Sequence, residues 1–303
     1  MINTIKSSNR RTKFLGVLKN QALMWILLVP TVISLVICAW NPIIRGIYTS
    51  FFRTQGFNAV EFVGFKNYVN VLTDTMFLQT LVNTVKYVFW SLLFGGIPPI
   101  IIAVIFQEVI HFRKTVRLLT YIPSVAPALA VSVIWMSIFS PTAGGLLNQM
   151  MISLGVGQKA WLENPALTIP LMMISASWSG IPGTVLLYFA ALQSVNQDLY
   201  EAAIIDGAGI WKRFRKITLP HLYPTILLMW VRQIIGIFQI FQEPLVMTDG
   251  GPNYASLSIN LTAYKMAFTY GQVDRSLALS TVTFVILLGI SIIYFKMDKK
   301  VNG

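Results

Sequence analysis

Six long apolar runs most restrict what this chain can fold into. They lie near residues 22–44, 83–106, 118–140, 166–192, 224–244 and 276–296 of the 303-residue chain. About 20 apolar residues in a helix are enough to cross the hydrocarbon core of a bilayer. Only 11% of the residues are charged, whereas a soluble domain carries about a quarter. The pattern predicts an all-α polytopic membrane protein with six transmembrane helices in one domain, residues 1–303.

The basic residues predict how these spans are oriented. With the amino terminus inside, 15 of the 23 Lys and Arg fall in cytoplasmic segments and six fall outside, while Lys86 and Arg232 lie within spans. Because cytoplasmic loops carry the excess of Lys and Arg in membrane proteins, both termini are expected in the cytoplasm. The same bias explains the net charge of +12 without nucleic acid. The first run is too long for a cleaved signal peptide and is predicted to stay as a span.

The longest polar stretch between two runs, residues 194–223, has a specific order. Asn196 or Ser194 can cap the start of a helix, and Gly207 and Gly209 can stop that helix and permit a sharp turn. A second short helix with Lys and Arg on one face follows, and Pro220 and Pro224 are expected to end it. The alternative is an ordinary basic loop. The order predicts a helix-turn-helix on the membrane surface, a shape that suits docking into a groove on a partner.

The same segment carries a family resemblance. Glu201-Ala202-Ala203, then Gly207, then Ile217-Thr218-Leu219-Pro220 resemble the EAA loop of ABC importer permeases. The resemblance implies the type I importer permease fold, in which this loop docks into a cleft on a cytoplasmic ATPase and transmits its closure to the spans. The coupling residues that it implies are Glu201, Ala202, Ala203, Asp206, Gly207, Ile217, Leu219 and Pro220. Asn196 stands where the family often has Pro, and both residues suit a helix start.

Three shorter motifs resemble the carbohydrate branch of that family. They are Gly64 with Asn67-Tyr68, Gly145-Leu146-Leu147-Asn148 with Trp161-Leu162, and Gly250-Gly251-Pro252. The last resembles a signature of the maltose-type subunit that pairs with a second, different permease. The resemblance implies import of a sugar or oligosaccharide with three kinds of partner: a second permease subunit, two copies of an ATPase and an extracellular solute-binding protein. It also implies the cell membrane of a bacterium or archaeon, with ATP and Mg on the ATPase and no cofactor on this chain.

Polar and aromatic residues inside the runs are candidates for a solute pathway. In the fifth run, Arg232, Gly236, Gln239 and Glu243 fall close to one helical face, and such a stripe should face protein or water rather than lipid. It could line a polar path or form interhelical hydrogen bonds. Aromatic rings often stack on sugars, although most aromatic residues in membrane proteins pack or anchor. The pathway candidates are Trp178, Tyr188, Trp230, Arg232, Gln239 and Glu243.

The sequence lacks the motifs that are typical of ATP hydrolysis and of metal binding. The chain has no P-loop for ATP hydrolysis, and its two histidines, His111 and His221, lie in predicted loops, so neither an enzyme nor a metal centre is expected. Two alternatives stay open. One is an ABC permease for a non-sugar solute, since Arg232 would suit glycerol phosphate and Glu243 a polyamine. The other is a stand-alone secondary transporter, which would have no need of the 194–223 segment.

Overall fold

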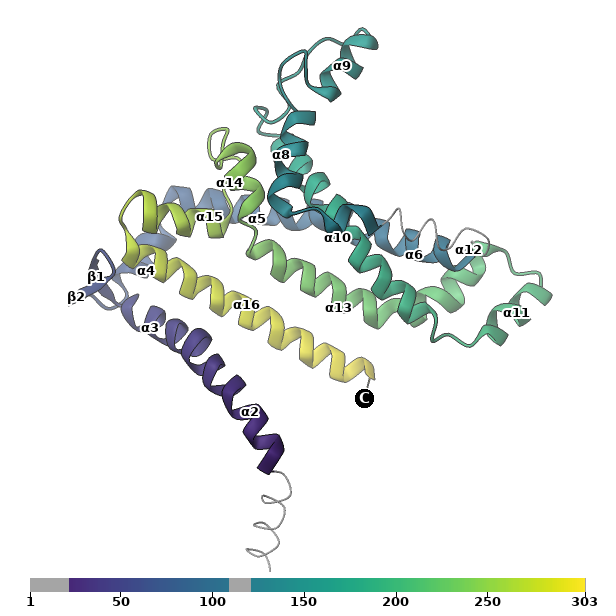
Figure 1. Cartoon of the computed structure of the whole chain (residues 1–303), viewed down its shortest axis with the longest axis horizontal. Coiled ribbons are helices and arrows are strands. Elements are labelled where there is room, and N and C mark those ends of the chain that lie inside the picture. Colours follow the sequence, from purple (N-terminus) through teal and green to yellow (C-terminus); the bar gives the residue numbers. More distant parts are fainter. Residues whose placement is uncertain (1–21, 109–120, 303) are drawn as a thin grey trace, which may run out of the picture.

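Long helices form the body of the molecule in the computed structural model, which describes residues 22–108 and 121–302 (Figure 1). The elements before the first gap are α2 (Ala22–Leu35), η1 (Val36–Trp40), α3 (Asn41–Thr49), β1 (Phe52–Gln55), β2 (Asn58–Phe62), α4 (Lys66–Leu72), α5 (Thr75–Ser91), η2 (Leu92–Gly96) and α6 (Pro98–Glu108), where η marks a π-helix. After it come α8 (Ala128–Ile138), α9 (Leu146–Ser153), α10 (Thr168–Leu192), α11 (Gln197–Ile205), α12 (Ile210–Arg213), η3 (Phe214–Thr218), α13 (Leu219–Phe238), α14 (Gln242–Thr248), α15 (Ile259–Tyr264), η4 (Lys265–Thr269) and α16 (Val273–Asn302).

Five of these helical segments are long and apolar enough to cross a membrane. They are Ile26–Thr49, Thr75–Gln107, Thr168–Leu192, Ile210–Phe238 and Val273–Lys296. The remaining predicted span, 118–140, is interrupted: its described residues are helical over 121–125, break at Ala126 and Pro127, and continue as the shorter apolar helix α8. Residues 118–120 of that span lie outside the described part of the chain. The multi-pass helical architecture is therefore confirmed, and the sixth span stays a prediction.

The fifth predicted span differs most from the structure. Helices α12, η3 and α13 form one continuous helix of 29 residues, so the expectation that Pro220 and Pro224 end a short helix was wrong. Pro220 directly follows the π-helical turn η3 and Leu219, and a local π-type turn is one way in which a membrane helix accommodates a proline. Pro224 lies inside α13, and neighbouring groups can satisfy a freed carbonyl in a packed membrane helix. The helix ends at Phe238, earlier than the predicted residue 244.

Smaller corrections concern the other boundaries. The second span begins at Thr75 rather than at residue 83, because Asp74 caps the helix by accepting a hydrogen bond from the backbone N–H of Met76 at 2.8 Å. The prediction of an all-α chain missed the antiparallel hairpin of β1 and β2. Its tip has positive φ at Gly56, and Arg53 and Glu61 pair across it at 3.0 Å.

The helices place different loops at opposite ends of the molecule. Figure 1 shows α11 and α12 at one end, near the end of α6, and the β1–β2 hairpin, α4 and α15 at the other. Clusters of buried side chains join the helices between these ends. One of them, with Val185, Tyr188, Leu192, Leu222 and Ile226, joins α10 to α13 beside the 194–223 segment. The 194–223 segment therefore joins two helices that pack tightly against each other.

Helix α9 projects away from the other helices (Figure 1), and Asn148 organises the loop that carries it. This side chain is fully buried. Its amide nitrogen donates to the carbonyl oxygens of Ser140 and Lys159, each at 3.0 Å, and its oxygen accepts from the Trp161 indole at 2.8 Å. The sequence motif that contains Asn148 and Trp161 is thus a structural unit, because the Trp161 indole N–H and the Asn148 side-chain oxygen bond to each other.

Candidate functional site

Helix α11 begins and ends where the sequence predicts. The Asn196 side chain caps its start by accepting a hydrogen bond at 3.0 Å from the backbone N–H two residues on. After its end, Gly207 has a φ of 70°. The N–H of Ala208 donates to the carbonyl of Ala203 at 2.8 Å, and that of Gly207 donates to the carbonyl of Ile204 at 2.9 Å. This is the Schellman pattern, which requires a left-handed residue and therefore favours glycine.

Two side-chain contacts tie α11 to the helix that follows the turn. The buried Tyr200 hydroxyl lies 2.9 Å from Oγ1 of Thr218, and Oγ of Ser194 lies 3.0 Å from Nε2 of His221. Thr218 ends η3 and His221 lies in the first turn of α13. Because η3 and α13 are one continuous helix, both contacts join α11 to the long apolar helix Ile210–Phe238.

The predicted coupling residues divide into two groups by exposure. Glu201, Ala202, Asp206, Gly207 and Pro220 are exposed, and Ala203, Ile217 and Leu219 are half-buried. Leu219 packs against the cluster that joins α10 to α13. The first group is therefore available to a partner, while Leu219 connects the segment to the spans.

Large apolar side chains accompany the exposed group. Ile205 is 85% exposed, Trp211 is 72% exposed and Ile204 is 56% exposed. The neighbouring Lys212, Arg215 and Lys216 are exposed as well. Exposed apolar side chains rimmed by polar ones mark interaction surfaces. The tip of the 194–223 segment therefore has the composition of a protein-docking surface.

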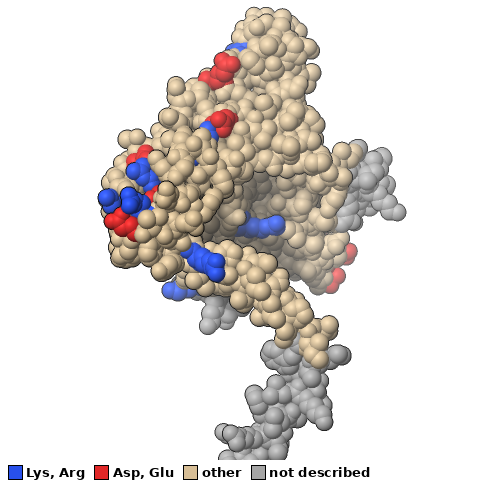
Figure 2. Space-filling view, turned by 60° about the vertical axis from the view of Figure 1, so that its left-hand side comes forward, with Lys and Arg blue, Asp and Glu red and all other residues tan. Residues whose placement is uncertain are grey.

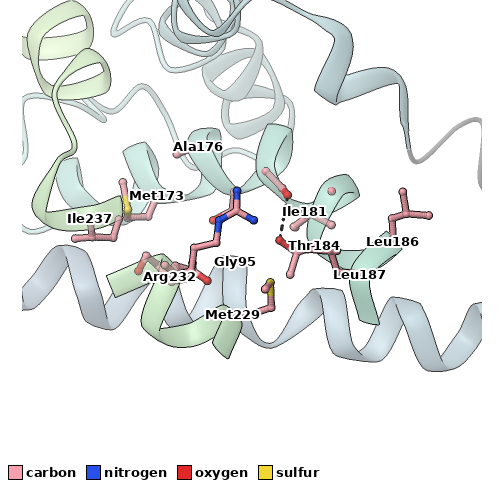
Figure 3. Close-up of a pocket in the computed structure, with 15 residues that line it drawn as sticks. Gly95, Met173, Ala176, Ile181, Thr184, Leu186, Leu187, Met229, Arg232 and Ile237 are labelled. Carbon is pink, nitrogen blue, oxygen red and sulfur yellow. Dashed lines mark hydrogen bonds between the residues drawn. The ribbon is translucent and has the colours of Figure 1, made fainter. Parts of the chain in front are cut away.

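A second candidate site is a cavity of about 530 Å³ between α5–η2, α10 and α13. Figure 3 shows the side chains around it, and the molecular surface is hollowed in Figure 2. Its lining residues are Ser91, Gly95, Met173, Ala176, Ser177, Gly180, Ile181, Gly183, Thr184, Leu186, Leu187, Met229, Arg232, Gln233 and Ile237. This volume lies within the range of small-molecule sites.

Small residues on α10 open the cavity. The helix runs unbroken through the buried Pro182. Gly180 and Gly183 face open space, since a Cβ added at either would meet no atom within 4 Å. Ser177 and Thr184 add hydroxyl groups to the same lining. The small residues of α10 therefore form one wall of this cavity.

The opposite wall is close-packed at Gly95. A Cβ at this position would lie 2.6 Å from Nε2 of Gln233 and 3.0 Å from Oγ of Ser177. The Gln233 amide itself donates to the carbonyl oxygen of Ser91 at 2.6 Å. A larger residue here would have to displace the end of the Gln233 side chain, which occupies the space that a Cβ would need.

Of the six pathway candidates, Arg232 lines the cavity. Its guanidinium points into the space between the helices in Figure 3. Trp178 is 40% exposed and stands edge-on to Trp135, with ring centroids 6.2 Å apart. Tyr188 is fully buried in the cluster between α10 and α13, and Trp230 packs against the same cluster. Their solute roles stay predictions, but these three side chains lie outside the lining of this cavity.

Gln239 and Glu243 lie beyond the fifth span, so the expected single stripe with Arg232 was wrong. Gln239 follows the last residue of α13, and its carbonyl accepts a hydrogen bond from the Asn260 side chain at 2.9 Å. Glu243 is in the first turn of α14. Burial raises the pKa of its carboxyl above the usual 4.5, and a backbone hydrogen bond partly opposes this. The break after Phe238 thus separates the arginine from the glutamate.

Sequence reasoning missed a polar face of α5 that holds the loop after α14. The Asn83 amide donates to the carbonyls of Tyr254 at 2.7 Å and Leu257 at 3.1 Å. The Tyr87 hydroxyl donates to the carbonyl of Ser256 at 2.8 Å. All four polar residues of this face are buried: Thr80, Asn83, Thr84 and Tyr87. Their helical spacing was the signal that could have found them.

The Gly-Gly-Pro turn leads into the same loop. Asp249 before it has a φ of 49° and Gly250 a φ of 85°, as a tight turn requires. The Lys265 ammonium binds Asp249 twice, at 2.9 Å to the carboxylate and at 2.8 Å to the carbonyl oxygen. The Lys265 side chain thus fixes the residue that precedes the two glycines of this turn.

The family model for "binding-protein-dependent transport system inner membrane component" matches residues 96–302. The chain belongs to this family. The match includes the 194–223 segment and most of the cavity lining. The predicted resemblance to ABC importer permeases is therefore confirmed.

Curated relatives match nearly the whole permease. A "probable ABC transporter permease protein YurN" of Bacillus subtilis (strain 168) is 30% identical over 93% of this chain and 97% of its own length. The "trehalose/maltose transport system permease protein MalF" of Thermococcus litoralis is 31% identical over 91% of this chain and 93% of its own length.

Solved structures match it as well. A chain of "a bacterial ABC transporter involved in the import of the acidic polysaccharide alginate" has a TM-score of 0.86 and 26% identity, over 96% of this permease and 100% of that chain. Another, from a bacterial alginate ABC transporter "in complex with alginate pentasaccharide-bound periplasmic protein", has a TM-score of 0.84, 26% identity and coverage of 94% and 97%. The type I permease architecture expected from the sequence is thus matched along the chain.

Proposed function

We propose that this permease is the transmembrane subunit of an ATP-driven, binding-protein-dependent importer for a sugar or oligosaccharide. The support for the solute class is that similar permeases over nine-tenths of the chain carry names of sugar transport systems. The chain itself hydrolyses no ATP in this proposal; ATP and Mg bind a separate ATPase. The protein is placed in the cell membrane of a bacterium or archaeon, with both termini in the cytoplasm.

The observation that carries the coupling proposal is the continuity of the 194–223 segment with α13. Its tip exposes Ile205 and Trp211 to a partner. Its base is bonded to the spanning helix through Tyr200 and Thr218. When ATP closes a pair of ATPase subunits, a groove that holds the tip would move it, and α13 would move as a unit with it. A ligand can shift the outward-facing and inward-facing states only by its different affinity for them.

The full transporter in this proposal has a second permease subunit, two ATPase copies and an extracellular solute-binding protein. The first long helix leaves its apolar stretch unburied within the described chain, so this surface is free to contact lipid or the second permease. A solved relative forms a complex with a solute-loaded periplasmic protein, which supports delivery of solute from outside.

Purification of the complex tests this function. In mild detergent from the native host, this chain should purify with a second permease and two ATPase copies, identified by mass spectrometry. A sugar together with its binding protein should stimulate the ATPase. A chain that purifies alone and moves solute without ATP would contradict the proposal.

A charge reversal tests the coupling role by itself. Glu201→Lys should abolish transport while the assembled permease keeps its thermal stability, because Glu201 is exposed. The matched control is Glu163→Lys, the same change at an exposed residue outside the 194–223 segment. Normal uptake with Glu201→Lys would refute docking through this surface.

A further inference from the structure

We propose that the cavity between α5–η2, α10 and α13 binds a polyhydroxylated solute that carries an anionic group, and that Arg232 pairs with that group. The proposal rests on the proposed import function and narrows its substrate class. The anionic group is a carboxylate, as in an acidic saccharide, or a phosphate, as in a phosphorylated polyol. Both offer the oxygen pair that a guanidinium binds through two parallel hydrogen bonds.

The first argument is the charge of the lining. Arg232 is the single ionisable side chain among the described residues that line the cavity, and the lining contains no Asp or Glu. Glu243, which could have balanced it on one helical face, lies in α14 beyond the end of α13. The cavity therefore carries a net positive charge, which disfavours a cationic solute such as a polyamine.

The second argument is that the arginine lacks a partner within its own subunit. Across residues 22–108 and 121–302, Arg232 makes no hydrogen bond and no ion pair. An ionised side chain in a membrane-spanning helix is costly unless it is paired or faces water. The guanidinium reaches into the cavity rather than along a neighbouring helix (Figure 3). A bound anion would supply the missing charge.

The third argument is the arrangement of the other lining groups. The hydroxyls of Ser177 and Thr184 and the amide of Gln233 line the same space, and such groups can meet solute hydroxyls. Met229 and Ile237 give apolar contact on the α13 side. Small-molecule sites combine an apolar lining with a few convergent polar groups in this way. The mixture suits a polyhydroxylated ring better than a bare inorganic anion.

Competitive uptake tests the proposal in native-host cells that lack the chromosomal permease and carry it on a plasmid. The medium contains maltotriose, arabinotriose, cellotriose, trigalacturonate, a mannuronate trisaccharide, a glucuronate-substituted xylotriose and glycerol 3-phosphate. Mass spectrometry measures which of these solutes the cells deplete. The variants are Arg232→Gln, Arg232→Lys and, as a matched loss of charge, Lys86→Gln, because Lys86 lies exposed on α5 outside the cavity lining.

The proposal expects permease-dependent depletion of an anionic solute. Arg232→Gln should lower that uptake about tenfold or more, as expected for the loss of a charge-assisted hydrogen bond. Arg232→Lys should have a smaller effect, and Lys86→Gln almost none. Depletion of a uronate identifies a saccharide carboxylate, and depletion of glycerol 3-phosphate identifies a phosphate.

Three other results are distinguishable. Depletion of neutral sugars alone would overturn the anionic solute and leave the sugar-import function standing. Failure of Arg232→Gln to assemble with the second permease subunit would overturn the proposal as well, because the arginine would then pair with that subunit. The absence of any permease-dependent uptake would count against the proposed function itself.

Discussion

Replacement of Gly207 by serine should weaken the 194–223 segment without harming the rest of the fold. Gly207 has a φ of 70°, and a Cβ added there would meet no atom within 4 Å. Any cost is therefore one of backbone conformation rather than of packing. A non-glycine residue in the left-handed region costs about 1–2 kcal/mol, which corresponds to a roughly five- to thirtyfold change in an equilibrium constant.

Gly209 supplies a matched control on the same loop. A Cβ added at Gly209 would likewise meet no atom within 4 Å, but its φ is −63° and it precedes the first residue of α12. Serine is favoured at such a helix start, so Gly209→Ser should be neutral or slightly stabilising. Gly207→Asn should recover part of the loss, because asparagine tolerates the left-handed region better than serine does.

Hydrogen exchange on the assembled transporter measures the effect directly. In Gly207→Ser, protection of the Ala208 amide, which donates to the carbonyl of Ala203, should fall roughly five- to thirtyfold. Solute-stimulated ATPase activity should fall with it, while the melting temperature of the complex stays unchanged. Equal protection in Gly207→Ser and Gly209→Ser would refute the reasoning, since the two variants differ in the sign of φ.

Three further changes test other contacts. Tyr200→Phe removes the hydroxyl that meets Thr218 and should lower transport more than ATP hydrolysis; Tyr223→Phe, at an exposed residue, should leave both unchanged in the same coupled assay. Asn83→Leu leaves two carbonyls without a donor and should lower stability by about 2–4 kcal/mol; an unchanged melting temperature would contradict this. Because burial raises the folded-state pKa of Glu243 above 4.5, the folded complex binds this proton more tightly than the unfolded chain does. The melting temperature should therefore rise as pH falls through the folded-state pKa toward 4.5, and Glu243→Gln should abolish that trend.

These predictions separate two functions that meet in α13. One end of this helix continues into η3 and α12 and carries the 194–223 segment. Further along, Arg232 and Gln233 form part of the cavity. In the proposed mechanism, a movement driven at the docking surface therefore reaches the solute cavity through one rigid element. Variants of Tyr200 and Arg232 should consequently differ in phenotype, the first affecting coupling and the second affecting solute choice.

Local signals in the sequence were enough for several elements. The cap at Asn196 and the left-handed turn at Gly207 both follow from the chemistry of single residues. The long apolar runs identified five helices of membrane-spanning length. Such features were predictable because they depend on side chains only a few positions apart. The family resemblance likewise depended on the order of short motifs along the chain.

Features that depend on contacts between distant segments were not predictable. Pro220 and Pro224 looked like helix ends, but α13, which packs against α10, is continuous through both. Gln239 and Glu243 looked like a stripe with Arg232, but the helix ends before them. Neither outcome is encoded in the local pattern, because helix continuity in a bundle depends on what neighbouring helices contribute.

The sequence by itself determined the class of protein, the helix α11 and turn of the 194–223 segment, and the presence of an arginine in a long apolar run. The class of protein follows from the composition and hydropathy of the whole chain, and a turn depends only on neighbouring residues. Both can therefore be predicted without knowledge of the tertiary structure. Only the tertiary structure decided that Arg232 faces a cavity and lacks a partner among the described residues, and that Asn83 and Tyr87 hold the loop after α14. Each of these depends on residues that are far apart in the chain and meet only when the helices pack.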